Sequence, residues 1–222
     1  MGTLLNRRRY MGGVAAPPYD ENSYIQDGLV FQLDGINKGS NQGYWTDLKG
    51  NVAFTIPTSE YLTEETNGFT WTGDVNMPNS GTMPNGETYT VEIAMFSKRF
   101  ASLSRISIFA TRTGSTKGDI QICRWNTNFF CLARTNSVAA SSLVDNTFMT
   151  ISFNTLAACI NKNEVQFNGN ADYMTQSQTG IGRTGVYNGM RGTIHAIRIY
   201  NRQLTLAEMQ FNQDIDLKRF GT

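Results

Sequence analysis

Short segments in which apolar and polar residues alternate follow one another along most of this chain, from Tyr24 onward. In Thr90–Phe96, for example, Val91, Ile93 and Met95 share one face, because side chains alternate between the two faces of a strand. Other segments of this kind are 106–110, 120–122, 130–132 and 149–153, and 28–34 is a short apolar run. No long helical pattern separates them, and Asn-Gly pairs, which are typical of hairpin turns, stand at Asn67-Gly68, Asn85-Gly86, Asn168-Gly169 and Asn188-Gly189. The pattern predicts an all-β fold, an antiparallel β-sandwich or jelly roll.

The composition favours the same fold class and excludes two kinds of protein. Asparagine and threonine supply 21 and 25 of the 222 residues. Threonine is common in strands and asparagine in turns. With 19 basic and 18 acidic residues, the formal net charge is only +1. This balance excludes a strongly basic nucleic-acid-binding domain and an acidic disordered chain.

The first 22 residues have no hydrophobic period and are rich in Gly, Pro and Arg. We interpret residues 1–22 as an extended N-terminal arm and residues 23–222 as one sandwich domain. Glycine and proline interrupt the apolar stretch of the arm, so we expect neither a secretory signal nor membrane insertion. We expect the arm to anchor on an acidic protein surface, rather than on a specific nucleic acid, through Arg7, Arg8, Arg9 and Tyr10.

One helix is predicted, close to the C-terminus. Thr205 and Glu208 have the spacing of a capping box, in which each side chain bonds the backbone N–H of the other residue. Leu204 and Met209 flank this box and can form a hydrophobic staple. We expect the helix to extend to about Gln213 or slightly beyond.

The three cysteines include no Cys-x-x-Cys pair, which argues against a disulfide framework and against a zinc site. If a turn is centred on Thr127, Cys123 and Cys131 lie opposite each other in a hairpin. Two interpretations stay open here: a cross-strand disulfide, or small buried side chains in a reducing cytosol.

The C-terminal third carries a specific motif, GIGRTGVYNGMRGTIHAIRIYNRQLTLAE at residues 180–208. It resembles the closing motif of the concanavalin A-like, laminin-G-like jelly rolls of bacterial and phage proteins. The segment 28–39 and the Trp-x-Asp-x-x-Gly-Asn element that begins at Trp45 resemble the opening of the same family. The resemblance covers about residues 25–215 and implies a jelly-roll sandwich. It leaves the function open, because this fold hosts lectins, hydrolases and adhesive modules.

Many proteins of this family bind a structural Ca²⁺ through acids of the opening motif and an Asp that follows the Gly-x-Ile turn. Asp34 and Asp47 match the opening acids, but His195 occupies the late position. Calcium takes several oxygen ligands, so the loss of this carboxylate counts against the site. We therefore expect no cofactor, and name Asp34 and Asp47 as the residues to inspect for a metal.

The start of the chain carries a looser resemblance. The segment from Arg7 to Gly13, followed by Pro18-Tyr19-Asp20, resembles the start of laminin-G-like proteins of gut-bacterial (Bacteroides-type) phages and prophages. This implies a phage virion protein, capsid-associated or part of a fibre, that is made in the host cytoplasm. Such a structural or decoration protein would dock on other virion proteins, or on itself as a homo-oligomer, through its arm. It could also present its sandwich to host-surface glycans.

Catalytic motifs known from this fold are absent. Retaining glucanases of this fold carry Glu-x-Asp-x-x-Glu on one strand, which points all three acids into one cleft. The corresponding strand here has Glu92 alone, which we interpret as a charge on a solvated face. His195 is interpreted as a structural histidine with one hydrogen bond. The sequence thus predicts that the chain is not an enzyme, and a glycoside hydrolase is the least favoured hypothesis.

Sugar binding requires exposed aromatic side chains with polar partners around them. The candidate glycan-binding residues are Trp71, Trp125, Tyr173 and Tyr187. Burial is at least as good an interpretation for Trp71 and Trp125, and we expect Trp45 to be packed. The alternative to a virion protein is a carbohydrate-binding module of a gut bacterium, on the cell surface or secreted.

Overall fold

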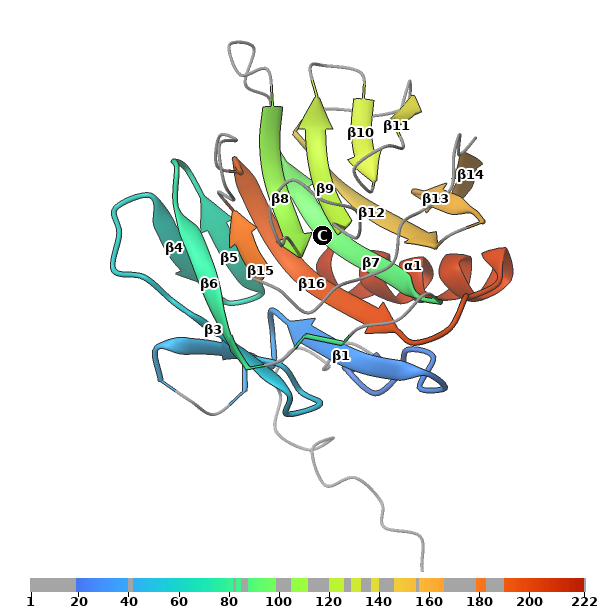
Figure 1. Ribbon diagram of the computed structural model, residues 1–222, viewed down its shortest axis with the longest axis horizontal. Coiled ribbons are helices and arrows are strands. Elements are labelled where there is room, and N and C mark those ends of the chain that lie inside the picture. Colours follow the sequence, from blue (N-terminus) through green and yellow to red (C-terminus); the bar gives the residue numbers. More distant parts are fainter. Residues whose placement is uncertain are drawn as a thin grey trace, which may run out of the picture.

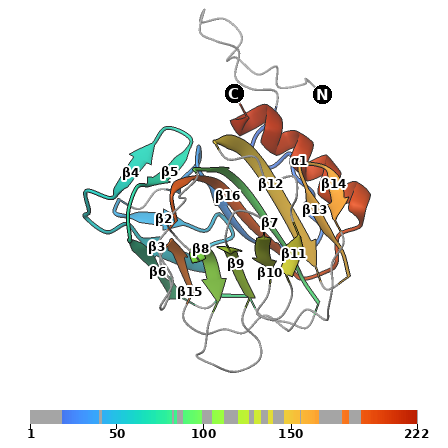
Figure 2. The same ribbon diagram turned by 90° about the horizontal axis from the view of Figure 1, so that it is seen from above.

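A computed structural model describes residues 19–39, 42–81, 83–84, 88–98, 105–111, 120–125, 129–132, 137–139, 146–154, 156–165, 179–182 and 190–221. These residues form two eight-stranded antiparallel sheets that face each other, with one helix on the outer side of one sheet (Figures 1 and 2). The predicted all-β antiparallel sandwich with a single short C-terminal helix is confirmed. No helix in this described part of the chain is long and apolar enough to cross a membrane.

The sheet next to the helix, called sheet 1, holds most of the residues discussed below. Its strands are, in spatial order, β14 (Asn163–Val165), β13 (Ala158–Ile160), β12 (Thr147–Asn154), β7 (Thr90–Ser97), β16 (Gly192–Tyr200), β5 (Gly68–Trp71) and β4 (Leu62–Glu65), with β1 (Leu29–Asp34) also paired to β16. Sheet 2 consists of β11 (Ser137–Ala139), β10 (Phe129–Leu132), β9 (Ile120–Trp125), β8 (Arg105–Thr111), β15 (Thr179–Gly182), β6 (Asn76–Gly81), β3 (Val52–Thr55) and β2 (Tyr44–Thr46).

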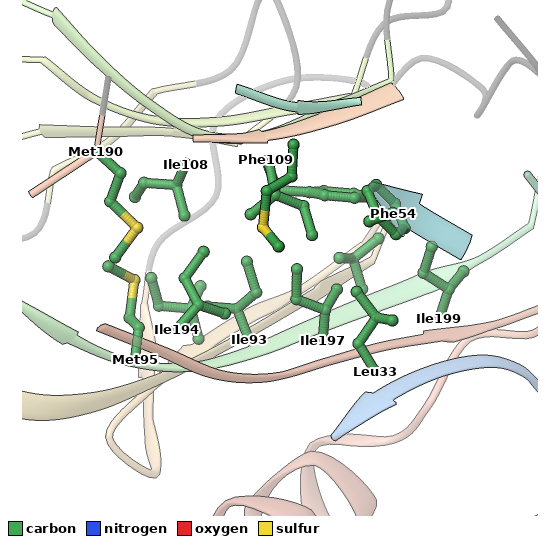
Figure 3. Close-up of a cluster of buried hydrophobic side chains, with 14 of the residues drawn as sticks. Leu33, Phe54, Ile93, Met95, Ile108, Phe109, Met190, Ile194, Ile197 and Ile199 are labelled. Atoms are coloured by element: carbon green, nitrogen blue, oxygen red, sulfur yellow. The ribbon is translucent and has the colours of Figure 1, made fainter. Parts of the chain in front are cut away.

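The main core fills the space between the two sheets. Val91, Ile93 and Met95, which the alternation of β7 places on one face, are all buried there. Figure 3 shows Ile93 and Met95 on sheet 1 pointing toward Ile108 and Phe109 on sheet 2. Burial of an aliphatic or aromatic side chain contributes roughly 1.5–3 kcal/mol, so this layer is the main source of stability.

The hairpin turns follow the local sequence. The turn between β4 and β5 lies beside the Asn67-Gly68 pair: its two central residues are Thr66 and Asn67, and Gly68 is already the first residue of β5, paired with Glu65. Asn161 and Lys162 join β13 to β14, and their φ angles of 48° and 68° fit the two-residue turn whose twist matches antiparallel strands. The other three Asn-Gly pairs lie outside the described residues.

The β9–β10 hairpin has the register expected from its turn, because Cys123 and Cys131 are directly opposed backbone positions. Their side chains lie outside the described part of the structure, so the two interpretations of this pair stay open. Cys159 is a free, buried thiol, and burial raises its pKa to about 11.

Helix α1 (Leu206–Phe220) begins with the predicted capping box: the Thr205 hydroxyl accepts from the Glu208 backbone N–H, and the Glu208 carboxylate accepts from the Thr205 backbone N–H. Leu204 and Met209 lie in one apolar cluster, as expected for a hydrophobic staple. The helix extends to Phe220, well past the end that we expected at Gln213 or slightly beyond. Hydrophobic periodicity misses this last part because many of the residues that the helix buries are polar.

Two of those polar residues, Asp216 and Arg219, belong to a buried charge cluster between α1 and the outer face of sheet 1. The cluster is formed by Asp34, Glu92, Arg198, Asp216 and Arg219. Arg198 donates to Glu92 (2.9 Å) and, through both terminal nitrogens, to Asp216 (2.9 and 2.5 Å). Arg219 donates to Asp34 at 2.6 Å. The prediction that Glu92 lies on a solvated face is wrong: its side chain is 1% exposed because α1 covers this part of the sheet. Burial raises the pKa of Glu92, and Arg198 opposes that shift.

The first described residues run beside α1. Tyr24 is buried, donates to Asp216 at 2.9 Å and lies under the Arg198 guanidinium, 3.9 Å from ring centre to carbon. The Tyr19 hydroxyl accepts from Lys218, and the Glu21 carbonyl accepts from Gln32. Residues 19–22, assigned to the arm from sequence, thus contact the sandwich. The candidate anchors Arg7, Arg8, Arg9 and Tyr10 lie outside the described residues.

Candidate functional site

A row of four side chains crosses the outer face of sheet 1, where α1 no longer covers it. Thr70 of β5 is paired with Thr193 of β16, Thr193 with Phe96 of β7, and Phe96 with Phe148 of β12. Directly opposed residues of antiparallel strands point to the same face of the sheet. The register therefore brings two hydroxyl groups and two aromatic rings from four strands into one line.

A β-bulge adds His195 to this surface. The pairing of β16 with β7 shifts between Ile194 and Ala196, which leaves His195 as the extra residue. A bulge changes the direction in which a strand presents a side chain. The His195 ring stacks on Phe220 at the end of α1 (centroids 5.3 Å apart, planes 20° apart) and lies 5.7 Å from the Phe148 ring.

Together these groups form a pocket of about 420 Å³, which we call the outer pocket. The four residues of the row and His195 line part of this pocket. The β4–β5 turn, the start of β12 and the last residues of α1 line the rest. The lining residues from these three segments are Glu65, Asn67, Asn146, Thr147, Phe220 and Gly221.

The polar groups of the outer pocket are arranged for hydrogen bonding. The Thr70 and Thr193 hydroxyl oxygens are 2.7 Å apart, so one donates to the other, and the accepting hydroxyl keeps its own proton for a further partner. Asn146 has a φ of 59°, in the left-handed region that asparagine tolerates better than most residues, and its backbone N–H donates to Ser97. The outer pocket thus suits a small ligand with an apolar face and several hydroxyl groups.

His195 contributes as a neutral ring. Its Nδ1 lies 2.8 Å from the carbonyl oxygen of Asn67, and a carbonyl only accepts, so Nδ1 carries the proton and Nε2 is an acceptor. Burial lowers the pKa of His195, which favours the uncharged ring at neutral pH. The single hydrogen bond expected for a structural histidine is present. The place of His195 in a pocket was not predicted.

Among the residues predicted to bind glycans, only Trp71 has a described side chain. Trp71 is 0% exposed and lies in the core between the sheets, where no sugar can stack on it. Trp125 belongs to β9, but its side chain is not described, and Tyr173 and Tyr187 lie outside the described residues. These three residues stay predictions.

Asp34 and Asp47, the two residues to inspect for a metal, accept hydrogen bonds from other groups of the chain. Asp47 accepts from the backbone N–H groups of Gln32, Lys49 and Asn51, at 2.7–3.1 Å. Asp34 accepts from two backbone N–H groups and from Arg219. Carboxylates bonded in this way stabilise the loops around them. Within the described residues, no group of three or more His, Cys, Asp or Glu is placed to hold a metal ion.

Sequence reasoning missed the residues of the outer pocket. Phe96 belongs to a predicted strand, on the face opposite the core residues, so alternation alone would class it as solvent-facing. Phe148 directly precedes the predicted segment 149–153, and Thr193 was placed in the Gly-x-Ile turn, whereas both belong to strands, β12 and β16. Their assembly depends on which strands are neighbours and on the bulge at His195. Neither can be read from local periodicity.

The comparisons with known proteins agree on the fold. No protein-family model matches the chain, and neither does any curated protein sequence. A sialidase from Trypanosoma rangeli has a similar structure, with a TM-score of 0.61 at 14% identity over 85% of this chain and 33% of that one. The same sialidase in complex with sialic acid gives 0.63 at 13% identity, over 85% and 33% of the two chains. The binding domain of botulinum neurotoxin serotype D gives 0.62 at 14% identity, over 85% and 52%.

This chain therefore spans about a third of the sialidases and half of the toxin binding domain. At such low identity the matches show a shared β-sandwich fold and nothing finer. They nevertheless correct one prediction. The exclusion of enzymatic activity is wrong, because solved structures with this fold include enzymes, the sialidases. The absence of one glucanase motif excludes only the chemistry of that motif.

Proposed function

We propose that this chain is a carbohydrate-binding β-sandwich and that the outer pocket is its sugar site. The row of Thr70, Thr193, Phe96 and Phe148 carries the proposal, because it joins aromatic rings to hydroxyl groups on one surface. A sugar ring has an apolar C–H face and a rim of hydroxyl groups, and this surface complements both. The likeness to a sialidase that has been solved in complex with sialic acid supports the same class of ligand.

The substitution Phe148→Ala tests the sugar site. Phe148 is partly buried and lines the outer pocket, so its removal takes away a stacking surface. We expect the affinity for the best glycan from an array screen to fall about tenfold, as measured by calorimetry on the whole chain. Thr193→Val, which removes a hydroxyl and keeps the shape, should weaken binding with little change in thermal stability.

Phe211→Ala is the matched control, since Phe211 is a 48% exposed aromatic residue of α1 that does not line the outer pocket. It should bind like the unchanged chain. Equal binding by the Phe148 and Phe211 variants would place the sugar elsewhere on the molecule. An array without any hit would contradict the proposal.

We further propose that the chain performs this role on a phage particle. The support is the resemblance of the N-terminal segment to laminin-G-like phage proteins. Arg7, Arg8, Arg9 and Tyr10 would anchor the sandwich on a virion protein or on another copy of the chain, and the outer pocket would bind glycans of the host surface. Antibodies against the chain should then label purified phage particles.

The alternative is a carbohydrate-binding module of a gut bacterium, on the cell surface or secreted. The outer pocket favours this alternative as much as the virion protein, since both roles need a sugar site. Labelling of the bacterial surface in cells that hold no phage particles would support this alternative over the virion protein.

A further inference from the structure

We infer that the outer pocket accepts sugars that are uncharged or carry an amine and discriminates against sugars that carry a carboxylate. The inference rests on the proposed function and specifies its ligand. It comes from the charges around the pocket. The described groups that line it are neutral or negative, and no lysine or arginine is among them.

Glu65 supplies the negative charge. It is the last residue of β4, is exposed, and lines the outer pocket. Lys38 donates to the backbone carbonyl of Glu65, but its ammonium group is paired with the carboxylate of Glu64 at 3.3 Å. Within the described residues the Glu65 carboxylate has no ion-pair partner, so its charge remains available to a ligand.

The end of α1 adds to the negative potential. Phe220 and Gly221 bring the C-terminal end of the helix to the outer pocket. The aligned peptide dipoles of a helix place a partial negative charge at this end, equivalent to about half an elementary charge. A carboxylate in the outer pocket would meet both this end and Glu65.

The last turn of α1 holds two cations, Lys218 and Arg219. Arg219 is bound to Asp34 at 2.6 Å, which offsets its charge, whereas Lys218 bonds the neutral Tyr19 hydroxyl at 3.1 Å and keeps its charge. His195 lines the pocket but is neutral, for the reason given above. No lysine or arginine is among the described residues that line the outer pocket. The charge pattern therefore argues against the sialic acid that the sialidase binds.

The test is a printed array of neutral, amine-bearing and carboxylated glycans, probed with the full chain and with Glu65→Gln. We expect the hits to be neutral and amine-bearing sugars. Calorimetry then compares the strongest neutral hit with its sialylated counterpart. Glu65→Gln should raise the affinity for the sialylated sugar, relative to the neutral one, about fivefold. For the unchanged chain, salt at 0.5 M should reduce the difference between the affinities for the neutral and the sialylated sugar, because it screens exposed charges.

Glu64→Gln is the matched control, since Glu64 is the neighbouring acid on the other face of β4 and does not line the pocket. It should leave the ratio of the two affinities unchanged. Sialylated glycans as the main hits, or an unchanged ratio in Glu65→Gln, would overturn the inference and leave the sugar site in place. An array with no hit of any charge would instead overturn the proposed function and this inference with it.

Discussion

Arg198 lies at the centre of the buried charge cluster and connects sheet 1 to α1. Its guanidinium binds Glu92 on β7 and Asp216 on the helix, and none of its side chain is exposed. Removing a charge from water costs desolvation free energy, and here the oppositely charged partners in close contact offset that cost. Tyr24 adds an aromatic face over Arg198, and burial raises the pKa of that tyrosine, which keeps it protonated as a donor.

Arg198→Met should lower the free energy of unfolding by about 3–5 kcal/mol, because it leaves two carboxylates buried without their cation. Chemical denaturation at neutral pH measures this change. Arg191→Met is the control: Arg191 pairs at 3.2 Å with an Asp74 side chain that is 40% exposed, so the loss should be about 1 kcal/mol or less. A similar loss in both variants would show that the cluster contributes no more than a surface pair.

Helix α1 is held at its start by local contacts and along its length by tertiary ones. Glu208 binds back to Thr205 and also accepts two hydrogen bonds from Arg202, at 2.7 and 3.1 Å. These bonds, chiefly those from Arg202, lower the pKa of Glu208 to about 2. The lowered value means that the folded chain prefers the ionised carboxylate.

The contribution of this pair should depend on pH. Glu208 has a lower pKa in the folded chain than in the unfolded chain, where glutamate titrates near 4.3, so its stabilisation is present above that value and is lost as the pH falls toward 2. Glu208→Gln keeps the capping geometry and removes the charge. It should cost about 0.5–1 kcal/mol at neutral pH and clearly less near pH 2, where about half of the folded chains have lost this charge, as measured by chemical denaturation across this range. A cost that stays constant over the range would contradict the assignment to the Arg202 pair.

On the scale of the whole molecule, the structure places Tyr19 beside the last turn of α1, where its hydroxyl meets Lys218. Residues 1–18 therefore join the sandwich at the same end of the helix as the outer pocket.

If the arm mediates assembly, the full chain should be an oligomer and a chain of residues 19–222 a monomer. The shorter chain keeps Tyr19 and Tyr24, which contact α1, so its fold should be unchanged. Light scattering after size exclusion gives both masses. Monomers in both cases would contradict self-assembly through Arg7, Arg8, Arg9 and Tyr10 and would leave docking on a different protein as the role of the arm.

Local sequence predicted a strand or a helix start well where a single rule, such as strand alternation or helix capping, decides the structure. The inward set of Val91, Ile93 and Met95 and the capping box of Thr205 and Glu208 lie as expected, because each depends on spacing along a few residues. The glycan candidate Trp71 illustrates the limit of such rules. An aromatic residue in a strand is equally compatible with a core and with a surface, and only the second sheet shows that it is buried.

The sequence by itself determined the strands that carry a clear alternation, their inward faces, the position of the helix start and the antiparallel sandwich, since period and capping act over short distances. Tertiary structure decided the rest. The solvated face assigned to Glu92 became a buried charge cluster because a helix more than a hundred residues away covers it. The outer pocket arose from the order of β5, β16, β7 and β12 and from the bulge at His195. Strand order and register are long-range properties, and no local pattern contains them.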